Sequence, residues 1–265
     1  MVTVGDAHCH LADLPDPDAA VAGAADAGVA RILAVAMGPG DGARVLELKR
    51  RHPGSVLAGA GLHPSRVPRI SDAEASTELA LVAERAGQAD FIGEIGLDYK
   101  DAPDAESRRR QREILERLLD IAEHARLPVN MHTRRADRDL VEVARSFTRR
   151  TGLPALLHWF THSRGLARRC GEAGIYISAG PSIEIDTEQA RVAGVIAPDF
   201  LLVETDSPVE YAGRAANPAW ASRVSEALAA ARGEDPASLR TRLAANLERY
   251  LAAGRNPTPA QALGS

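Results

Sequence analysis

Two histidines separated by one residue are the first feature of this sequence that could support chemistry. His8 and His10 close an apolar segment near the start of the chain, with Cys9 between them. Because side chains alternate along an extended strand, both imidazoles would face one point and Cys9 would face the opposite side. Neutral imidazole is a common ligand of zinc and related divalent ions, so this spacing favours a metal site. The pair alone is also compatible with two hydrogen-bonded histidines at the end of a strand.

A carboxylate within an apolar segment gives a second, independent signal. Glu94 lies in a run of Phe, Ile, Leu and Gly residues that otherwise suits a buried strand. Burying an unpaired charge is strongly unfavourable, because the protein interior solvates the charge less well than water does. Glu94 is therefore expected either to pair with an arginine or lysine or to bind a metal ion.

Further polar residues end apolar segments in the same way. They are His63, His132, His158 and Asp206. Apart from His63, the candidates comprise four histidines and two carboxylates, which is more than one tetrahedral zinc requires. Such a set suits two divalent ions, Mg, Mn or Zn, that share a carboxylate and leave positions open for water. Any single member could instead lie behind the ligands and orient them.

The elements that must position these residues are short apolar segments alternating with longer helical patterns. The apolar segments are residues 2–7, 31–36, 55–62, 91–97, 128–132, 155–159, 175–179 and 200–204. Between them lie stretches with apolar residues three and four positions apart, most clearly at 107–125. This alternation predicts a parallel sheet, and eight repeats in this length predict a closed (β/α)₈ barrel of the TIM type. An open, doubly wound sheet is the alternative.

The sequence predicts a single barrel domain over residues 1–254. Helices at about 218–232 and 236–253 would close the barrel, and residues 255–265 are expected to form a flexible tail without chemistry. Active sites of such barrels lie at the C-terminal ends of the strands. The candidate residues named above occupy those ends, so we expect them to converge.

Composition limits the classes of function. The 32 Lys and Arg residues against 36 Asp and Glu residues give a net charge of −4, which argues against a protein that coats nucleic acid through a general basic field. Any phosphate site must therefore be local. The two cysteines are far apart and support neither a disulfide framework nor a zinc knuckle. Neither a signal peptide nor a membrane-spanning segment is recognised, so a cytoplasmic location is expected.

Six segments of the chain resemble the motifs of the TatD family of metal-dependent deoxyribonucleases, within the wider amidohydrolase-like barrels. In chain order they are DAHCHL, GLHP, GEIGLDY, LPVNMHTRRA, HWF and LLVETDSP. The resemblance spans nearly the whole chain, and GEIGLDY and ETDSP are its most specific parts. It implies that His8, His10 and Asp206 bind one metal ion, that His132 and His158 bind the other, that Glu94 bridges them, and that His63 faces the substrate phosphate.

The sequence also departs from the family pattern. After HWF the family usually has Ser-Gly, whereas residues 161–163 are Thr-His-Ser, so His162 is expected at the rim, where it would contact substrate. The usual Arg-Asn-x-Pro segment is replaced by residues 214–218, which have no arginine next to Asn217. These differences leave the substrate preference open.

An arginine is expected beside the metal ligands. Arg134 lies two positions after His132 and would point to the same side, so it could pair with a substrate phosphate. Arg135 is expected to face solvent.

Together these features predict a hydrolase in which two metal ions make a water molecule more acidic and stabilise the attacking and leaving oxygens. Asp206, on one ion and near that water, is the candidate general base, and Glu94 is the second catalytic carboxylate. The resemblance implies DNA as the substrate, with cleavage from 3′ to 5′. A single-stranded end is expected because few aromatic residues and no basic field are present. The alternatives are an aminoacyl-tRNA deacylase, a small-molecule amidohydrolase or lactonase, and a metal-stabilised barrel without catalysis.

Overall fold

A parallel sheet forms the centre of the molecule. The structure is a computed structural model and describes residues 2–160 and 163–252. Within these residues, eight parallel strands pair in chain order, each with the next. The strands are β1 (Val4–Cys9), β2 (Val29–Ala34), β3 (Val56–Ala60), β4 (Phe91–Asp98), β5 (Val129–Arg134), β6 (Ala155–Leu157), β7 (Tyr176–Ala179) and β8 (Leu201–Val203).

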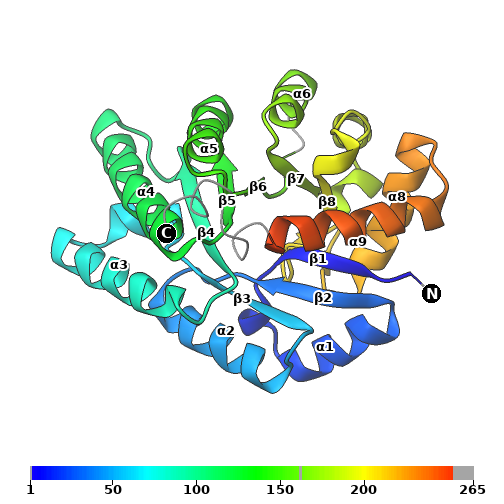
Figure 1. The fold of residues 1–265 in the computed structure, drawn as a ribbon, viewed down its shortest axis with the longest axis horizontal. Helices are drawn as coiled ribbons and strands as arrows, with labels where there is room; N and C mark the ends of the chain where they lie inside the picture. The colour runs from blue at the N-terminus through cyan, green and yellow to red at the C-terminus, as the bar shows by residue number, and fades with distance from the viewer. Residues whose placement is uncertain (1, 161–162, 253–265) are drawn as a thin grey trace, which may run out of the picture.

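The sheet closes where β1 meets the chain that follows β8. A parallel bridge joins Cys9 to Ser207, and the His10 amide donates to the Ser207 carbonyl at 2.8 Å. The Asp206 amide donates to the His8 carbonyl at 2.9 Å. The predicted TIM-type (β/α)₈ barrel is thus confirmed, and the open sheet is excluded (Figure 1).

Helices surround the strands. They are α1 (Pro17–Asp26), α2 (Pro39–Arg51), α3 (Asp72–Ala86), α4 (Ala105–Ala125), α5 (Asp137–Thr151), α6 (Arg164–Glu172), α7 (Thr187–Ala193), α8 (Trp220–Arg232) and α9 (Pro236–Ala252). Short 3₁₀ turns lie at Leu11–Asp13, Pro64–Arg69, Pro181–Glu184 and Pro198–Phe200. The strands are covered on both faces, which explains why they appear in the sequence as continuous apolar runs.

The sequence of α4, the longest helix described, determines where the helix begins and ends and which face is buried. The Asp104 side chain accepts a hydrogen bond from the Ser107 amide and caps α4, and Arg126 ends the helix in the left-handed conformation. Between these ends, Gln111, Ile114, Leu115, Leu118, Leu119 and Ala122 are buried on one stripe. Their spacing of three and four residues is the pattern that predicted a helix at 107–125.

Helix α9 covers the N-terminal end of the barrel. Leu247, Tyr250 and Leu251 pack in one buried cluster with side chains from the strands, among them Leu33 and Phe91. The side-chain amide of Asn246 donates to the carbonyl of Leu201 at the start of β8, at 2.7 Å. Because this end is filled, a solvent-accessible site must lie at the C-terminal ends of the strands.

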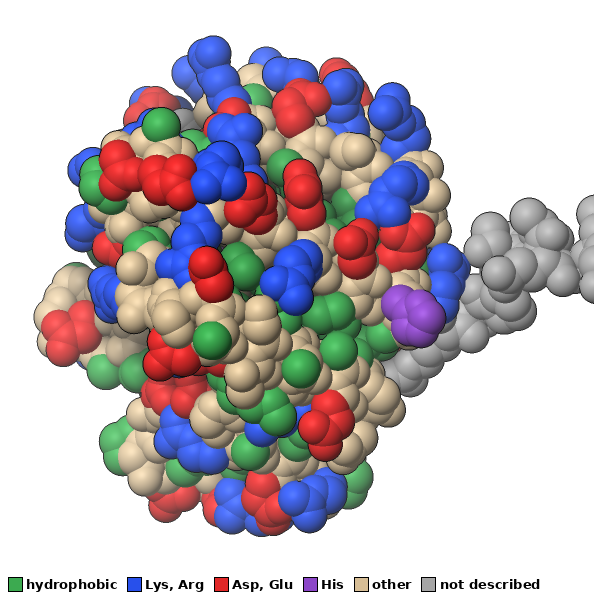
Figure 2. All heavy atoms as spheres, turned by 90° about the vertical axis from the view of Figure 1, so that its left-hand side faces the viewer, with side chains coloured by type: hydrophobic (Ala, Val, Ile, Leu, Met, Phe, Trp, Pro, Cys, Tyr) green, Lys and Arg blue, Asp and Glu red, His purple; other side chains and the backbone are tan. Residues whose placement is uncertain are grey.

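The surface carries mixed charge. Figure 2 shows basic and acidic side chains interspersed on the face of α3 and α4. There Arg109 pairs with both Glu106 and Glu113, as expected for a solvated helix surface. In the part of the chain that the structure describes, no helix is long and apolar enough to cross a membrane. The proposed tail, residues 255–265, lies outside the described residues.

Candidate metal centre

The predicted ligands come together at the C-terminal ends of the strands. His8 and His132 lie within β1 and β5, and Glu94 lies within β4. The other candidates lie just after strands. His10 directly follows β1, His158 directly follows β6, and Asp206 lies three residues past β8. His63 follows β3.

One oxygen of Glu94 belongs to a first donor set, which comprises His8, His10, Glu94 and Asp206. Glu94 Oε2 lies 3.5 Å from the Nε2 atoms of both His8 and His10. Asp206 Oδ1 lies 3.6 Å from His8 Nε2 and 3.3 Å from His10 Nε2. Ligands about 2.1 Å from a tetrahedral ion are about 3.4 Å from one another. The spacing of the first donor set therefore matches that of atoms around one ion.

The other oxygen of Glu94 belongs to a second donor set, which comprises Glu94, His132 and His158. Glu94 Oε1 lies 3.0 Å from both His132 Nδ1 and His158 Nε2, and these two nitrogens are 3.1 Å apart. The two oxygens of one buried carboxylate thus face different groups of nitrogen atoms. This arrangement can hold two ions with Glu94 between them.

Several buried atoms of the donor sets, and of a carboxylate behind them, have no hydrogen-bond partner among the described residues. They are His8 Nε2, Glu94 Oε2, His132 Nε2, His158 Nδ1, Glu204 Oε1 and Asp206 Oδ1. Buried polar atoms are normally satisfied, because leaving one without a partner costs about 1–3 kcal/mol. The residues present therefore fit a divalent metal, which would satisfy the atoms of the first donor set directly.

Hydrogen bonds on the far side of His8 fix which nitrogen faces the centre. The Asn130 amide nitrogen donates to the Ala7 carbonyl at 2.9 Å, which leaves Asn130 Oδ1 to accept from His8 Nδ1 at 2.9 Å. With its proton on Nδ1, His8 presents the lone pair of Nε2 to the first donor set, as a metal ligand requires.

The same argument separates His63 from the ligands. The Ser65 amide donates to His63 Nδ1 at 3.1 Å, so a neutral His63 carries its proton on Nε2. Burial lowers the pKa of His63, which favours this neutral form. Its Nε2 lies 3.3 Å from Glu94 Oε1 and therefore acts as a hydrogen-bond donor there. His63 thus places a hydrogen-bond donor, rather than a ligand atom, beside the second donor set.

Opposite charges hold the centre together without metal. Burial disfavours the charged form of His10, but contact with Asp206 and the charge of Glu94 outweigh burial and raise the pKa of His10 to about 9. Burial also opposes the charge of Glu94, yet the neighbouring histidines hold the pKa of that carboxyl well below its usual range. Protonated imidazole thus supplies the positive charge that a metal ion would bring.

Metal binding must consequently release protons. Below a pH of about 9 the His10 imidazole is protonated and its Nε2 cannot bind a metal, whereas the carboxylates stay ionised. We expect the apparent metal affinity to rise about tenfold per pH unit from pH 7 to 9 for each proton released, and then to level off. Calorimetry in buffers of different ionisation enthalpy measures the number of protons released. An affinity independent of pH over this range would contradict the prediction.

Two buried carboxylates that sequence analysis did not assign lie behind the second donor set. Asp98 Oδ2 is 3.4 Å from His132 Nε2, and Glu204 Oε1 is 3.7 Å from His158 Nδ1. Ser178 Oγ donates to the other Glu204 oxygen. His8, His158 and Glu204 also form a group of possible ligands. Glu204 carried the same signal as Glu94, an acid within an apolar run, and could have been found by it.

A cavity of about 400 Å³ adjoins the centre. It is lined by His132, Thr133, Arg134, His158, Trp159, Asp206 and Val209. Arg134 lines this cavity together with three of the candidate ligands. Phe160 is fully buried, Tyr99 is 8% exposed, and Cys9 is buried in the core. His162, the predicted rim residue, lies outside the described residues.

A parallel (β/α)₈ barrel with histidines and carboxylates gathered at its C-terminal strand ends defines a metal-dependent hydrolase of the barrel type. The chain belongs to the TatD family, because the family model described as TatD related DNase matches residues 5–252. The resemblance seen in the sequence is thereby confirmed.

Relatives agree with this assignment. The uncharacterized metal-dependent hydrolase YjjV of Escherichia coli is 33% identical over 242 residues, covering 86% of this chain and 90% of that protein. The deoxyribonuclease TATDN3 of Homo sapiens is 29% identical over 214 residues, covering 77% of each. The crystal structure of YjjV superposes with a TM-score of 0.82 at 28% identity, covering 94% of this chain and 98% of that one.

Proposed function

We propose that this enzyme is a two-metal phosphodiesterase that removes nucleotides from single-stranded DNA ends in the 3′ to 5′ direction. The observation that carries the proposal is that the two carboxylate oxygens of Glu94 face different histidines. Oε2 faces His8 and His10, while Oε1 faces His132 and His158. A carboxylate placed in this way can bridge two ions. The family and the name of the relative in Homo sapiens support DNA as the substrate.

Two divalent ions bound at this centre would supply positive charge, which would make a water molecule more acidic and stabilise the oxygens of the reacting phosphate. The chain supplies the remaining parts. Asp206, which is buried and lines the cavity, accepts the proton of the attacking water at its carboxylate. The neighbouring histidines keep the pKa of Asp206 low although burial opposes its charge, so the base is ionised at neutral pH.

Two residues orient the phosphate. His63 carries a proton on Nε2, which it can donate to a phosphate oxygen in place of Glu94 Oε1. Arg134 lines the cavity and, among the described residues, forms no ion pair, so its guanidinium is available to a second oxygen. A terminus can enter a cavity of about 400 Å³ more easily than a continuous duplex can.

We expect about two divalent ions per chain and metal-dependent cleavage that favours single-stranded ends. Elemental analysis gives the stoichiometry after loading with Mg, Mn or Zn. Oligonucleotides labelled at the 5′ or the 3′ end distinguish the direction of cleavage, and circular duplex of the same length serves as the control. Equal cleavage of linear and circular DNA would indicate an endonuclease instead. Cleavage of neither, together with turnover of a charged tRNA or a lactone, would replace the proposal with one of those reactions.

A further inference from the structure

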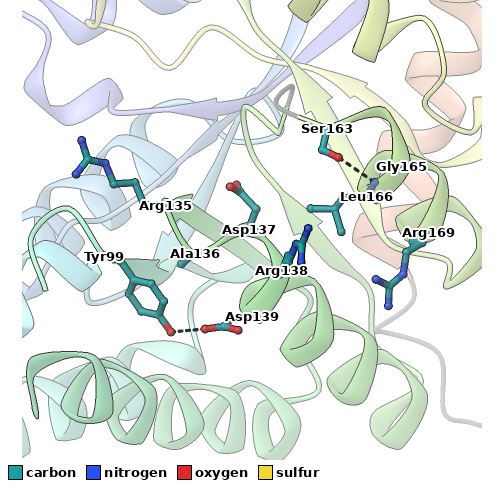
Figure 3. A pocket seen from close by; sticks show the side chains of 10 residues that line it. All are labelled: Tyr99, Arg135, Ala136, Asp137, Arg138, Asp139, Ser163, Gly165, Leu166 and Arg169. Carbon is teal, nitrogen blue, oxygen red and sulfur yellow. Dashed lines mark hydrogen bonds between the residues drawn. The ribbon is translucent and has the colours of Figure 1, made fainter. Parts of the chain in front are cut away.

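A second hollow lies beside the candidate metal centre, between the first turns of α5 and α6. Its volume is about 790 Å³, which exceeds that of the cavity at the metal centre. Charged and polar side chains form much of its lining. Among them are Arg135, Asp137, Arg138, Asp139, Ser163 and Arg169. Figure 3 shows Arg135 on one side of the hollow and Arg169 on the other, with Arg138 between them.

Two consecutive arginines line the hollow and the cavity at the metal centre, one in each. Arg134 lines the cavity at the centre, and Arg135 lines the hollow. Arg135 has a left-handed backbone with φ of 59°, a conformation uncommon for residues with a Cβ atom. The chain turns at this residue, so Arg134 lines the cavity at the metal centre while Arg135 lines the hollow. A chain of phosphates that leaves the metal centre would meet Arg134 first and Arg135 next.

More of the arginines that line the hollow than of its acids lack an oppositely charged partner among the described residues. Arg135 and Arg138 are exposed, and within residues 2–160 and 163–252 neither of them forms an ion pair. By contrast, Asp139 accepts hydrogen bonds from the Tyr99 hydroxyl at 2.7 Å and from Arg112 at 2.5 Å. Asp137, the remaining acid of the lining, accepts a 3.5 Å hydrogen bond from the Thr133 hydroxyl. The free guanidinium groups therefore favour an anionic ligand.

Arg169 adds charge on the opposite wall. It pairs with Glu142 at 2.6 Å, and that glutamate also contacts Arg145 at 2.7 Å, so one carboxylate is shared by two arginines. The protein as a whole is acidic, with a net charge of −4, and this local excess of arginine stands out against it.

We propose that the hollow between α5 and α6 binds the backbone phosphates of a nucleic-acid strand beyond the bond that is cleaved. The inference rests on the proposed function and extends it from the reacting phosphate to the rest of the strand. Arg135 and Arg138 are the principal contacts. Since guanidinium groups bind phosphate without regard to base, the contact supplies affinity without sequence preference.

The test compares a long and a short substrate of the metal-loaded enzyme. We expect the double variant Arg135→Ala/Arg138→Ala to lower kcat/KM about tenfold on a ten-nucleotide oligothymidylate, mainly through KM. Hydrolysis of thymidine 5′-monophosphate p-nitrophenyl ester, which reaches only the metal centre, should be unchanged. Alanine keeps a Cβ atom, so the left-handed backbone at residue 135 is no more strained than before.

Salt dependence gives a second readout. Binding of the same oligonucleotide is followed by fluorescence anisotropy in the Asp206→Asn background, in which cleavage is expected to be slow compared with the measurement. Loss of two phosphate contacts should reduce the slope of log affinity against log salt by about 1.4, because each contact to a single strand contributes about 0.7. The control is Arg149→Ala, which removes an exposed arginine near the other end of α5 and should leave both readouts unchanged.

The outcomes separate the inference from the proposed function. If the unaltered enzyme cleaves the oligonucleotide and the double variant matches it in kcat/KM and salt slope, the inference is wrong and the proposed function stands. An equal loss on the small ester would show that the arginines shape the metal centre instead. If the unaltered enzyme neither binds nor cleaves the oligonucleotide, both are overturned, whatever it does with the ester.

Discussion

Asp206→Asn should lower kcat by roughly 10²-fold to 10⁴-fold, the usual contribution of a positioned acid-base group. Asparagine keeps the size of aspartate and retains one oxygen that can face the first donor set. It cannot accept the proton of the attacking water, and it removes a negative charge that lies 3.3 Å from His10 Nε2. The loss should therefore appear in kcat over the whole range of metal concentration.

Metal content and thermal stability must be measured on the same preparation. Asp120→Asn, an exposed change on α4, controls for the loss of one carboxylate and should behave like the unaltered protein. Full recovery of Asp206→Asn at high metal concentration would show that Asp206 serves only to bind the ion. The assignment of Asp206 as general base would then be wrong.

The fold could be predicted almost completely, because its signals are local. Most strands are apolar runs that are buried on both faces, and the helices have apolar residues spaced three and four positions apart. The eight alternations of these two patterns predicted the barrel. The ends of the strands were less certain. For example, β2 begins at Val29 rather than at residue 31, and β6 ends at Leu157 rather than at residue 159. Strand ends depend on pairing with neighbours, which sequence periodicity does not report.

The candidate ligands could be predicted as a set, because a parallel barrel brings all C-terminal strand ends to one place. Their orientation could not be predicted. The proton of His8 is directed by Asn130, which is 122 positions away, and Glu204, which directly follows β8, lies behind His158. The hollow between α5 and α6 also escaped prediction, since Arg135 was expected simply to face solvent. Such features depend on side chains that meet only after folding.

Glu94→Gln should act first on metal content rather than on the chemical step. If Glu94 bridges two ions, glutamine removes the shared negative charge and replaces one of its two oxygens with an amide nitrogen, which is a poor ligand. The atoms concerned are close, since Oε2 lies 3.5 Å from His8 and His10, and Oε1 lies 3.0 Å from His132 and His158. We expect occupancy to fall from about two ions per chain to one or fewer, with a metal affinity at least tenfold weaker.

A metal titration distinguishes this variant from Asp206→Asn. Activity of Glu94→Gln should recover partly as metal is added, because excess ion restores occupancy while the general base is intact. Activity of Asp206→Asn should stay low at every concentration, because added metal cannot accept a proton. Glu116→Gln, an exposed change on α4, provides the matched control for both metal content and rate. If Glu94→Gln retained two tightly bound ions and lost only kcat, Glu94 would act on the reacting groups and the bridging role would be wrong.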